Sequence, residues 1–123
     1  MRHTVRLHGV IVGHPDLEFM DPTLGRAWGE FRPGFGYELV QPVFQLFAQA
    51  VPRNAAKKDQ ALLERYHESR DALHLELTDD RGRVIATSAI HIADYTEEPG
   101  APPPELDVLI SDTSYWARRT RAN

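Results

Sequence analysis

The stretch from Leu73 to Tyr95 constrains the fold more than any other part of the chain. It opens with leucines at every second position, which is the period-two pattern of a β-strand. The segment Asp79–Gly82 follows, with Asp and Gly where a type I turn ending in a left-handed residue prefers them. The chain then continues to Tyr95 with many Val, Ile and Thr residues. These features predict an antiparallel hairpin at the centre of a sheet.

Two pairing registers compete within this hairpin. The turn chemistry pairs Leu77 with Ile85 and, further from the turn, Leu75 with Thr87. The hydrophobic pattern prefers a shift of one residue, which puts Ile90 on the same face as the leucines. Because such a shift turns every side chain to the opposite face, both registers cannot hold along the whole strand. We expect the hydrophobic register over most of the length, with a β-bulge at the turn glycine or within residues 86–89 reconciling the two.

Helices and further strands are predicted from periodicity on either side of the hairpin. Apolar residues spaced three and four apart predict a helix over Tyr37–Val51, and a thinner stripe predicts a second over 55–72 with Asn54 as its N-cap. Apolar alternation predicts strands over Thr4–Val12 and Glu105–Ile110. A short terminal helix, capped by Ser111 or Asp112, is expected to dock Tyr115 and Trp116.

The segment His14–Gly36 is predicted to be a long ordered loop. Its three prolines and four glycines argue against a long helix or strand. Its aromatic and aliphatic content is too high for a disordered linker, so we expect it to pack on the body of the protein.

The element order is therefore β, loop, α, α, β, β, β within a single domain of residues 1–123. This order predicts an α+β fold: an antiparallel or mixed β-sheet of about four strands with two helices packed on one face. Residues 117–123, which carry three arginines, are expected to form a basic, frayed tail.

Composition and charge indicate the cellular compartment and limit the classes of binding partner. The chain has no cysteine, and its N-terminal apolar run is broken by Arg6 and His8, so we expect a soluble, cytoplasmic protein without a signal peptide. No apolar run approaches the ~18 residues that a membrane span needs. Residues 73–112 hold nine acidic and two basic side chains, a net charge of −7, so neither nucleic acid nor membrane is an expected partner.

Few residues suggest chemistry. No phosphate-binding loop, nucleophile elbow or zinc, calcium or kinase motif is present, so no cofactor or metal is expected. His74 and Glu76 share one face of the predicted strand, and His91 joins them only in the hydrophobic register; these three are the candidates for an acid–base or metal role. Arg32, Gly34 and Gly36 precede a helix and are candidates for an anion site.

A non-catalytic protein-binding or self-association module is the function that the sequence favours. The predicted sheet has apolar side chains on both faces, and two helices can cover only one of them. A homodimer with two-fold symmetry is the simplest assembly that covers the other. A small enzyme or metal-binding protein using the His/Glu cluster is the alternative. The expected interface residues are Trp28, Phe31, Phe35, Ile85 and Tyr95.

Overall fold

The computed structural model describes residues 2–53 and 57–121. In this part of the chain, eight antiparallel strands and three helices form an α+β fold. The strands are β1 (Thr4–Leu7), β2 (Val10–Pro15), β3 (Phe19–Asp21), β4 (Arg26–Pro33), β5 (Glu76–Thr78), β6 (Val84–Ile85), β7 (Thr87–Ala93) and β8 (Glu105–Ile110). The helices are α1 (Tyr37–Ala50), α2 (Gln60–Leu73) and α3 (Thr113–Arg121).

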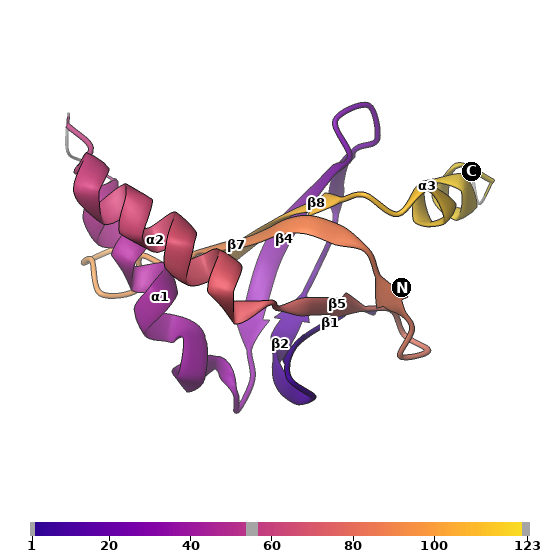
Figure 1. Cartoon of the computed structure of the whole chain (residues 1–123), viewed down its shortest axis with the longest axis horizontal. Helices are drawn as coiled ribbons and strands as arrows, with labels where there is room; N and C mark the ends of the chain where they lie inside the picture. The colour runs from indigo at the N-terminus through magenta and orange to yellow at the C-terminus, as the bar shows by residue number, and fades with distance from the viewer. Residues whose placement is uncertain (1, 54–56, 122–123) are drawn as a thin grey trace.

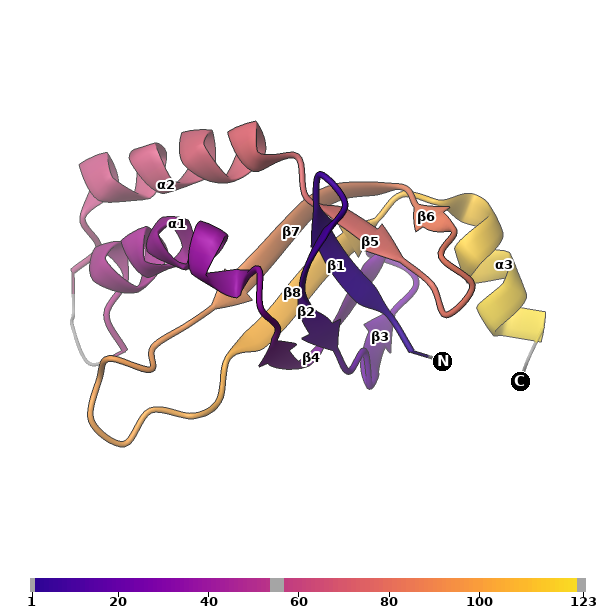
Figure 2. The same ribbon diagram turned by 90° about the horizontal axis from the view of Figure 1, so that it is seen from below.

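The sheet curls into a nearly closed barrel. Its strand order is β6-β5-β1-β2-β4-β8-β7, with β3 added beside β4. The two ends of this path, β6 and β7, are consecutive in the chain, so the sheet bends back on itself (Figure 2). The α+β prediction is confirmed, but the sheet has about twice the expected number of strands.

The helices α1 and α2 pack side by side at one end of the molecule, and α3 lies at the opposite end (Figure 1). Helix α1 contacts both β2 and β7, and α2 also contacts β7. The hydroxyl of Tyr37 donates a 2.6 Å hydrogen bond to Asp94, which anchors α1 to the end of β7. The core is continuous from α1 into the barrel; its fully buried large side chains include Val5, Val12, Phe31, Val40, Phe44, Leu77, Ile85, Ile92 and Leu106.

The predicted long loop over residues 14–36 is wrong, because the segment contains β3 and β4. In β4, Ala27, Gly29 and Phe31 are buried and alternate with more exposed residues. Gly29 is part of this strand for a steric reason: a Cβ there would lie 1.6 Å from the backbone oxygen of Asp16. The glycine permits the two backbones to cross closely. In the sequence pattern alone, the same glycine is read as a residue that interrupts a strand.

The predicted first strand is also divided. His8 and Gly9, with φ of 48° and 84°, form a two-residue turn between β1 and β2. Positive φ at both central residues is the geometry of a tight hairpin turn, which Asn-Gly or Asp-Gly usually marks. Histidine in the first of these positions gave no clear turn signal in the sequence.

The hydrophobic register is wrong next to the hairpin turn. Leu77 pairs with Ile85, as the turn chemistry required, and both side chains are buried. The pairing of β7 with β8 is irregular between Thr87 and Ala89, within the range expected for a bulge, and beyond it Ile90 is buried. The turn-chemistry register is therefore confirmed at Leu77–Ile85, whereas the hydrophobic pattern correctly predicts buried side chains in β7 but not a pairing with β5. The hairpin is also shorter than expected, because Leu73 belongs to α2 and β7 pairs with β8 rather than with β5.

The carboxylate of Asp79 holds the hairpin turn in shape. It accepts hydrogen bonds of 2.9 Å from the backbone N–H groups of Arg81 and Arg83 and from the Arg83 guanidinium. Burial opposes ionisation of Asp79, but these hydrogen bonds outweigh it and keep the pKa of its carboxyl below the usual value.

Replacing Asp79 by Ala is expected to lower the free energy of unfolding by about 2 kcal/mol, because two backbone N–H groups and one guanidinium lose their acceptor. Urea unfolding followed by circular dichroism measures this loss. The neighbouring exposed Asp80 provides the control, since Asp80→Ala removes an equal charge and is expected to change stability by less than about 0.5 kcal/mol. Equal midpoints for the two variants would contradict the role given to Asp79.

The predicted helices are confirmed in position, but their first and last residues differ from those in the structure. α1 coincides with the predicted helix to within one residue. α2 begins at Gln60, with Asp59 as its N-cap accepting from the Leu62 N–H, while the expected cap Asn54 lies outside the described residues. Asp112 accepts hydrogen bonds from the first turn of α3, and Tyr115 is buried as expected. α3 extends to Arg121, so residues 117–121 of the predicted tail are helical, while residues 122–123 lie outside the described residues.

Candidate functional site

Four exposed apolar side chains lie on two chain segments that come together at one end of the barrel. Val10 and Ile11 begin β2, Phe35 lies in the connection from β4 to α1, and Leu39 is in the first turn of α1. The side chain of Phe35 is fully exposed (104%), and that of Leu39 is 62% exposed. The β1–β2 turn and the β4–α1 connection reach the same end of the molecule in Figure 1. We call Val10, Ile11, Phe35 and Leu39 the apolar tip.

Backbone hydrogen bonds hold the two segments of the apolar tip together. The N–H of Gly36 donates to the oxygen of Ile11 at 2.9 Å, and that of Gly34 donates to the oxygen of Val12 at 2.7 Å. A Cβ on Gly36 would lie 2.5 Å from the Ile11 oxygen, so the chain packs here as closely as only glycine allows. The tip is therefore presented on a rigid base.

The residues predicted to bind an anion are already engaged in this arrangement. The N–H groups of Gly34 and Gly36 donate hydrogen bonds to carbonyl oxygens of β2, and the guanidinium of Arg32 forms an ion pair with Asp16. The predicted anion site therefore has neither a free amide at the two glycines nor an uncompensated charge at Arg32.

The predicted interface residues fall into three groups by burial. Phe31 and Ile85 are buried in the core, so neither can meet a partner without unfolding. Phe35 is exposed at the apolar tip, whereas Trp28 and Tyr95 are partly buried. Trp28 stacks against Phe19 on the outer face of the sheet, with the Arg26 guanidinium 4.1 Å from its ring centre, and the Tyr95 hydroxyl donates to the Val51 oxygen.

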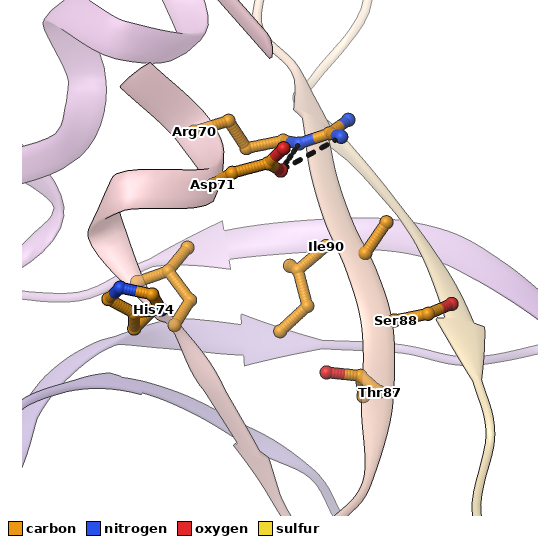
Figure 3. Close-up of a pocket in the computed structure, with 8 residues that line it drawn as sticks. Arg70, Asp71, His74, Thr87, Ser88 and Ile90 are labelled. Atoms are coloured by element: carbon orange, nitrogen blue, oxygen red, sulfur yellow. Dashed lines mark hydrogen bonds and ion pairs between the residues drawn. The ribbon is translucent and has the colours of Figure 1, made fainter. Parts of the chain in front are cut away.

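A cleft of about 290 Å³ opens where the predicted hairpin separates. One wall is the end of α2 with the two residues before β5, and the other is the first half of β7. Figure 3 shows Arg70 and Asp71 at one end of this cleft and Thr87 at the other, with Ile90 pointing into the space between. The lining residues are Arg70, Asp71, His74, Leu75, Thr87, Ser88, Ala89 and Ile90.

The separation of the hairpin has a local cause on each side. The β5–β6 ladder ends at the pair Leu77–Ile85. Beyond it, His74 adopts a left-handed conformation (φ 52°) as the C-cap of α2, which leads the chain away from the strand. On the opposite side, the irregularity at Thr87–Ala89 directs β7 to β8. The cleft therefore lies where Leu75 and Thr87 would have paired in a continuous hairpin.

Arg70 is the fixed positive charge of the cleft. Its guanidinium donates to Asp71 at 3.2 and 3.3 Å and lies 5.5 Å from the ring centre of Tyr66. The Arg70 side chain is 19% exposed, whereas that of Asp71 is 69% exposed. The cation is thus held by packing, while its carboxylate partner is largely in solvent.

His91 lies outside the cleft, packed beneath the helices. Its ring meets that of Phe47 edge-on at 4.4 Å, and its Nδ1 shares a hydrogen bond with the Tyr66 hydroxyl. Burial, together with the charge of Arg70, lowers the pKa of His91 to about 4. Among the described residues no group of three His, Asp or Glu side chains is arranged to hold a metal ion. The structure therefore does not gather His74, Glu76 and His91 into one metal site.

Sequence reasoning missed most residues of both surfaces. Neither Arg70 nor Leu39 is among the residues for which the sequence predicts a binding role. A signal for the cleft was nevertheless present, because the conflict between the two hairpin registers falls at the residues where the strands separate. The apolar tip had no such signal, since it depends on the hairpin turn at His8 and Gly9.

Comparison of the chain with protein-family models, curated proteins and solved structures found no match. Within residues 2–53 and 57–121, no helix has the length and apolar character needed to cross a membrane.

Proposed function

We propose that this protein is a non-catalytic protein-binding or self-association module and that the apolar tip is its binding surface. The observation that carries the proposal is the full exposure of Phe35 beside three other exposed apolar side chains on a rigid base. A large aromatic side chain in water gains free energy when a partner buries it, and such residues dominate the energetics of interfaces.

A second copy of the chain is the simplest partner in this proposal. The four tip side chains carry no charge, so two tips can meet about a two-fold axis without like charges among these residues. The module is expected to act in the cytoplasm, and the acidic stretch 73–112 disfavours nucleic acid and anionic membrane as partners.

The enzyme alternative has less support. His91 is one of the three candidate residues, but its ring is already hydrogen-bonded to Tyr66 and packed against Phe47. The lowered pKa of His91 favours a neutral imidazole in the folded protein. His74 and Glu76 remain near the surface, but their sites contain no third acid–base partner from the predicted cluster.

Replacing Phe35 by Glu is expected to weaken self-association by at least about tenfold, because the change puts a charge in the centre of the apolar contact. Light scattering over a concentration series measures the change as a fall of the average mass toward that of the monomer. Since the Phe35 side chain is fully exposed, the thermal unfolding midpoint of the variant should remain within a few degrees of the wild type.

The matched control is Leu24→Glu. Leu24 is 66% exposed in the turn between β3 and β4, outside the apolar tip, so this variant introduces the same charge at another exposed apolar position. Its association is expected to equal that of the wild type. A wild-type protein that stays monomeric at millimolar concentration would contradict self-association, and equal effects of the two variants would contradict the choice of surface.

A further inference from the structure

We propose that the cleft between α2 and β7 binds a short extended peptide that carries a carboxylate for Arg70. This site is separate from the apolar tip and does not depend on self-association. The proposal rests on three features of the cleft: a strand edge, a fixed cation and apolar walls.

The first feature is the edge of β7. Among the described strands β7 pairs only with β8, so alternate N–H and C=O groups on its other edge point away from the sheet. Over Thr87–Ile90 this edge lines the cleft. An unpaired strand edge is a template for an added strand, since main-chain hydrogen bonds to it do not depend on the sequence of the ligand.

The second feature is the guanidinium of Arg70. Its contact with the Tyr66 ring fixes its position before any ligand arrives, which lowers the entropic cost of binding. Its present partner, Asp71, is an adjacent residue on the same helix and is mostly in solvent. A carboxylate entering the cleft can therefore take the place of Asp71 and form a charge-assisted pair with Arg70.

The third feature is the shape and lining of the cleft. Leu75 and Ile90 supply apolar walls, and Thr87 supplies a hydroxyl at the end away from Arg70 (Figure 3). The four residues Thr87–Ile90 span about 10 Å in an extended strand, which matches about three residues of ligand. The volume of about 290 Å³ is also at the small end of ligand sites.

The position of the cleft in the fold supports a strand-like ligand over a compact one. The β5–β6 ladder stops at Leu77–Ile85, and the chain on either side of the cleft continues in extended form into β5 and β7. A peptide seated here fills the place where the predicted hairpin would have continued. Leu75 and Thr87 do not pair with each other, so their main-chain groups are the ones to which the peptide would form hydrogen bonds.

The probe for the experiment is the peptide acetyl-Val-Ala-Val with a free C-terminal carboxylate, titrated into isotope-labelled protein and followed by amide chemical shifts. The shifts are expected to concentrate at His74–Leu75 and Thr87–Ile90. The same peptide with a C-terminal amide should bind about tenfold more weakly, because it lacks the partner for Arg70. An amide-terminated peptide with Asp in the last position separates a side-chain carboxylate from a terminal one, and binding by either source supports the proposal.

Two variants on α2 test the role of the charge. Arg70→Gln is expected to weaken binding of the free-acid peptide about tenfold, whereas Arg65→Gln, on the exposed face of the same helix, leaves it unchanged. Asp71→Asn removes the competing carboxylate and is expected to tighten binding by severalfold. This second variant keeps the test decisive if Arg70→Gln loses packing on Tyr66 and unfolds.

The proposal is overturned if the free-acid peptide causes no shifts at these residues at millimolar concentration. It is also overturned if the amidated peptide binds equally well, or if sodium acetate alone reproduces the same shifts with the same affinity. Phe35→Glu lies outside the cleft and should leave peptide binding unchanged. The failure of self-association and the failure of peptide binding are therefore separate results.

Discussion

Gly29→Ala is expected to lower the free energy of unfolding by more than about 4 kcal/mol, which is a large part of the 5–15 kcal/mol typical of a domain. The added Cβ would lie 1.6 Å from the backbone oxygen of Asp16 and 2.8 Å from its carbonyl carbon. No rotamer change relieves this collision, because both groups belong to the main chain. The segment before β3 must move away from β4, and the hydrogen bond from the Asp16 N–H to the Glu30 oxygen is expected to break with it.

Thermal unfolding and the yield of folded protein measure this effect. The control is Gly100→Ala, in the loop between β7 and β8. Gly100 has a left-handed φ of 72° but open space around it, so alanine there suffers backbone strain without a collision and should cost about 1 kcal/mol. A Gly29→Ala protein as stable as Gly100→Ala would show that the crossing of the two backbones is not as close as described.

Acid is expected to destabilise the fold by about 5 kcal/mol between pH 6.5 and pH 4, before most carboxylates are protonated. Two histidines cause this loss, the buried His3 and the partly buried His91. Burial, with the charge of Arg119, lowers the pKa of His3 to about 4, and burial, with Arg70, lowers the pKa of His91 to about 4. Both rings are therefore neutral in the folded protein at a pH where the unfolded chain protonates them.

The direction of the effect follows from proton binding. Above pH 6.5 neither state holds the proton, and the full stability is present. As the pH falls from 6.5 to about 4, the unfolded state binds a proton at each site and the folded state does not, so stability falls by up to about 1.4 kcal/mol per pH unit for each histidine. Allowing for solvent near the rings, each site contributes about 2–3 kcal/mol. The carboxyls of Asp79 and Asp94, with pKa values below the usual range, add their own losses only at lower pH.

The geometry of His3 supports this expectation. The side chain is 1% exposed, and its Nδ1 has no hydrogen-bond partner among the described residues. Its Nε2 lies 3.4 Å from the hydroxyl of the equally buried Tyr115, which joins the start of β1 to α3. A proton on this ring would place an unpaired charge between the barrel and α3, which is costly in an apolar environment.

Urea unfolding at a series of pH values measures the slope. Replacing His91 by Gln removes one titrating group, so the variant should lose about half of the pH dependence between 6.5 and 4. A wild-type stability that is flat over this range would contradict the neutral state of the two histidines.

Local sequence signals determined the elements whose stabilising interactions are local. The three- and four-residue spacing of apolar side chains in Tyr37–Val51 located α1 almost to the residue, and alternation located β8. The side chain of Asp112 caps the next helix through bonds that reach only three residues along the chain. The hairpin turn at Asp79 belongs to the same class, because its carboxylate bonds residues two and four positions away. Interactions of this range depend on residues that are close together in the chain, so the local sequence is enough to predict them.

The tertiary structure decided the features that depend on residues far apart in the sequence. Gly29 is a strand residue only because the backbone at Asp16 crosses it, and the sequence alone presents it as an interruption. The hairpin separates into a cleft because β7 pairs with β8, whose residues lie 12 to 23 positions further along the chain. The exposed tip likewise required β2 to pair with β4, which brings Ile11 to Gly36. Steric crossings and strand competition are long-range effects, so both candidate binding surfaces became visible only in the folded chain.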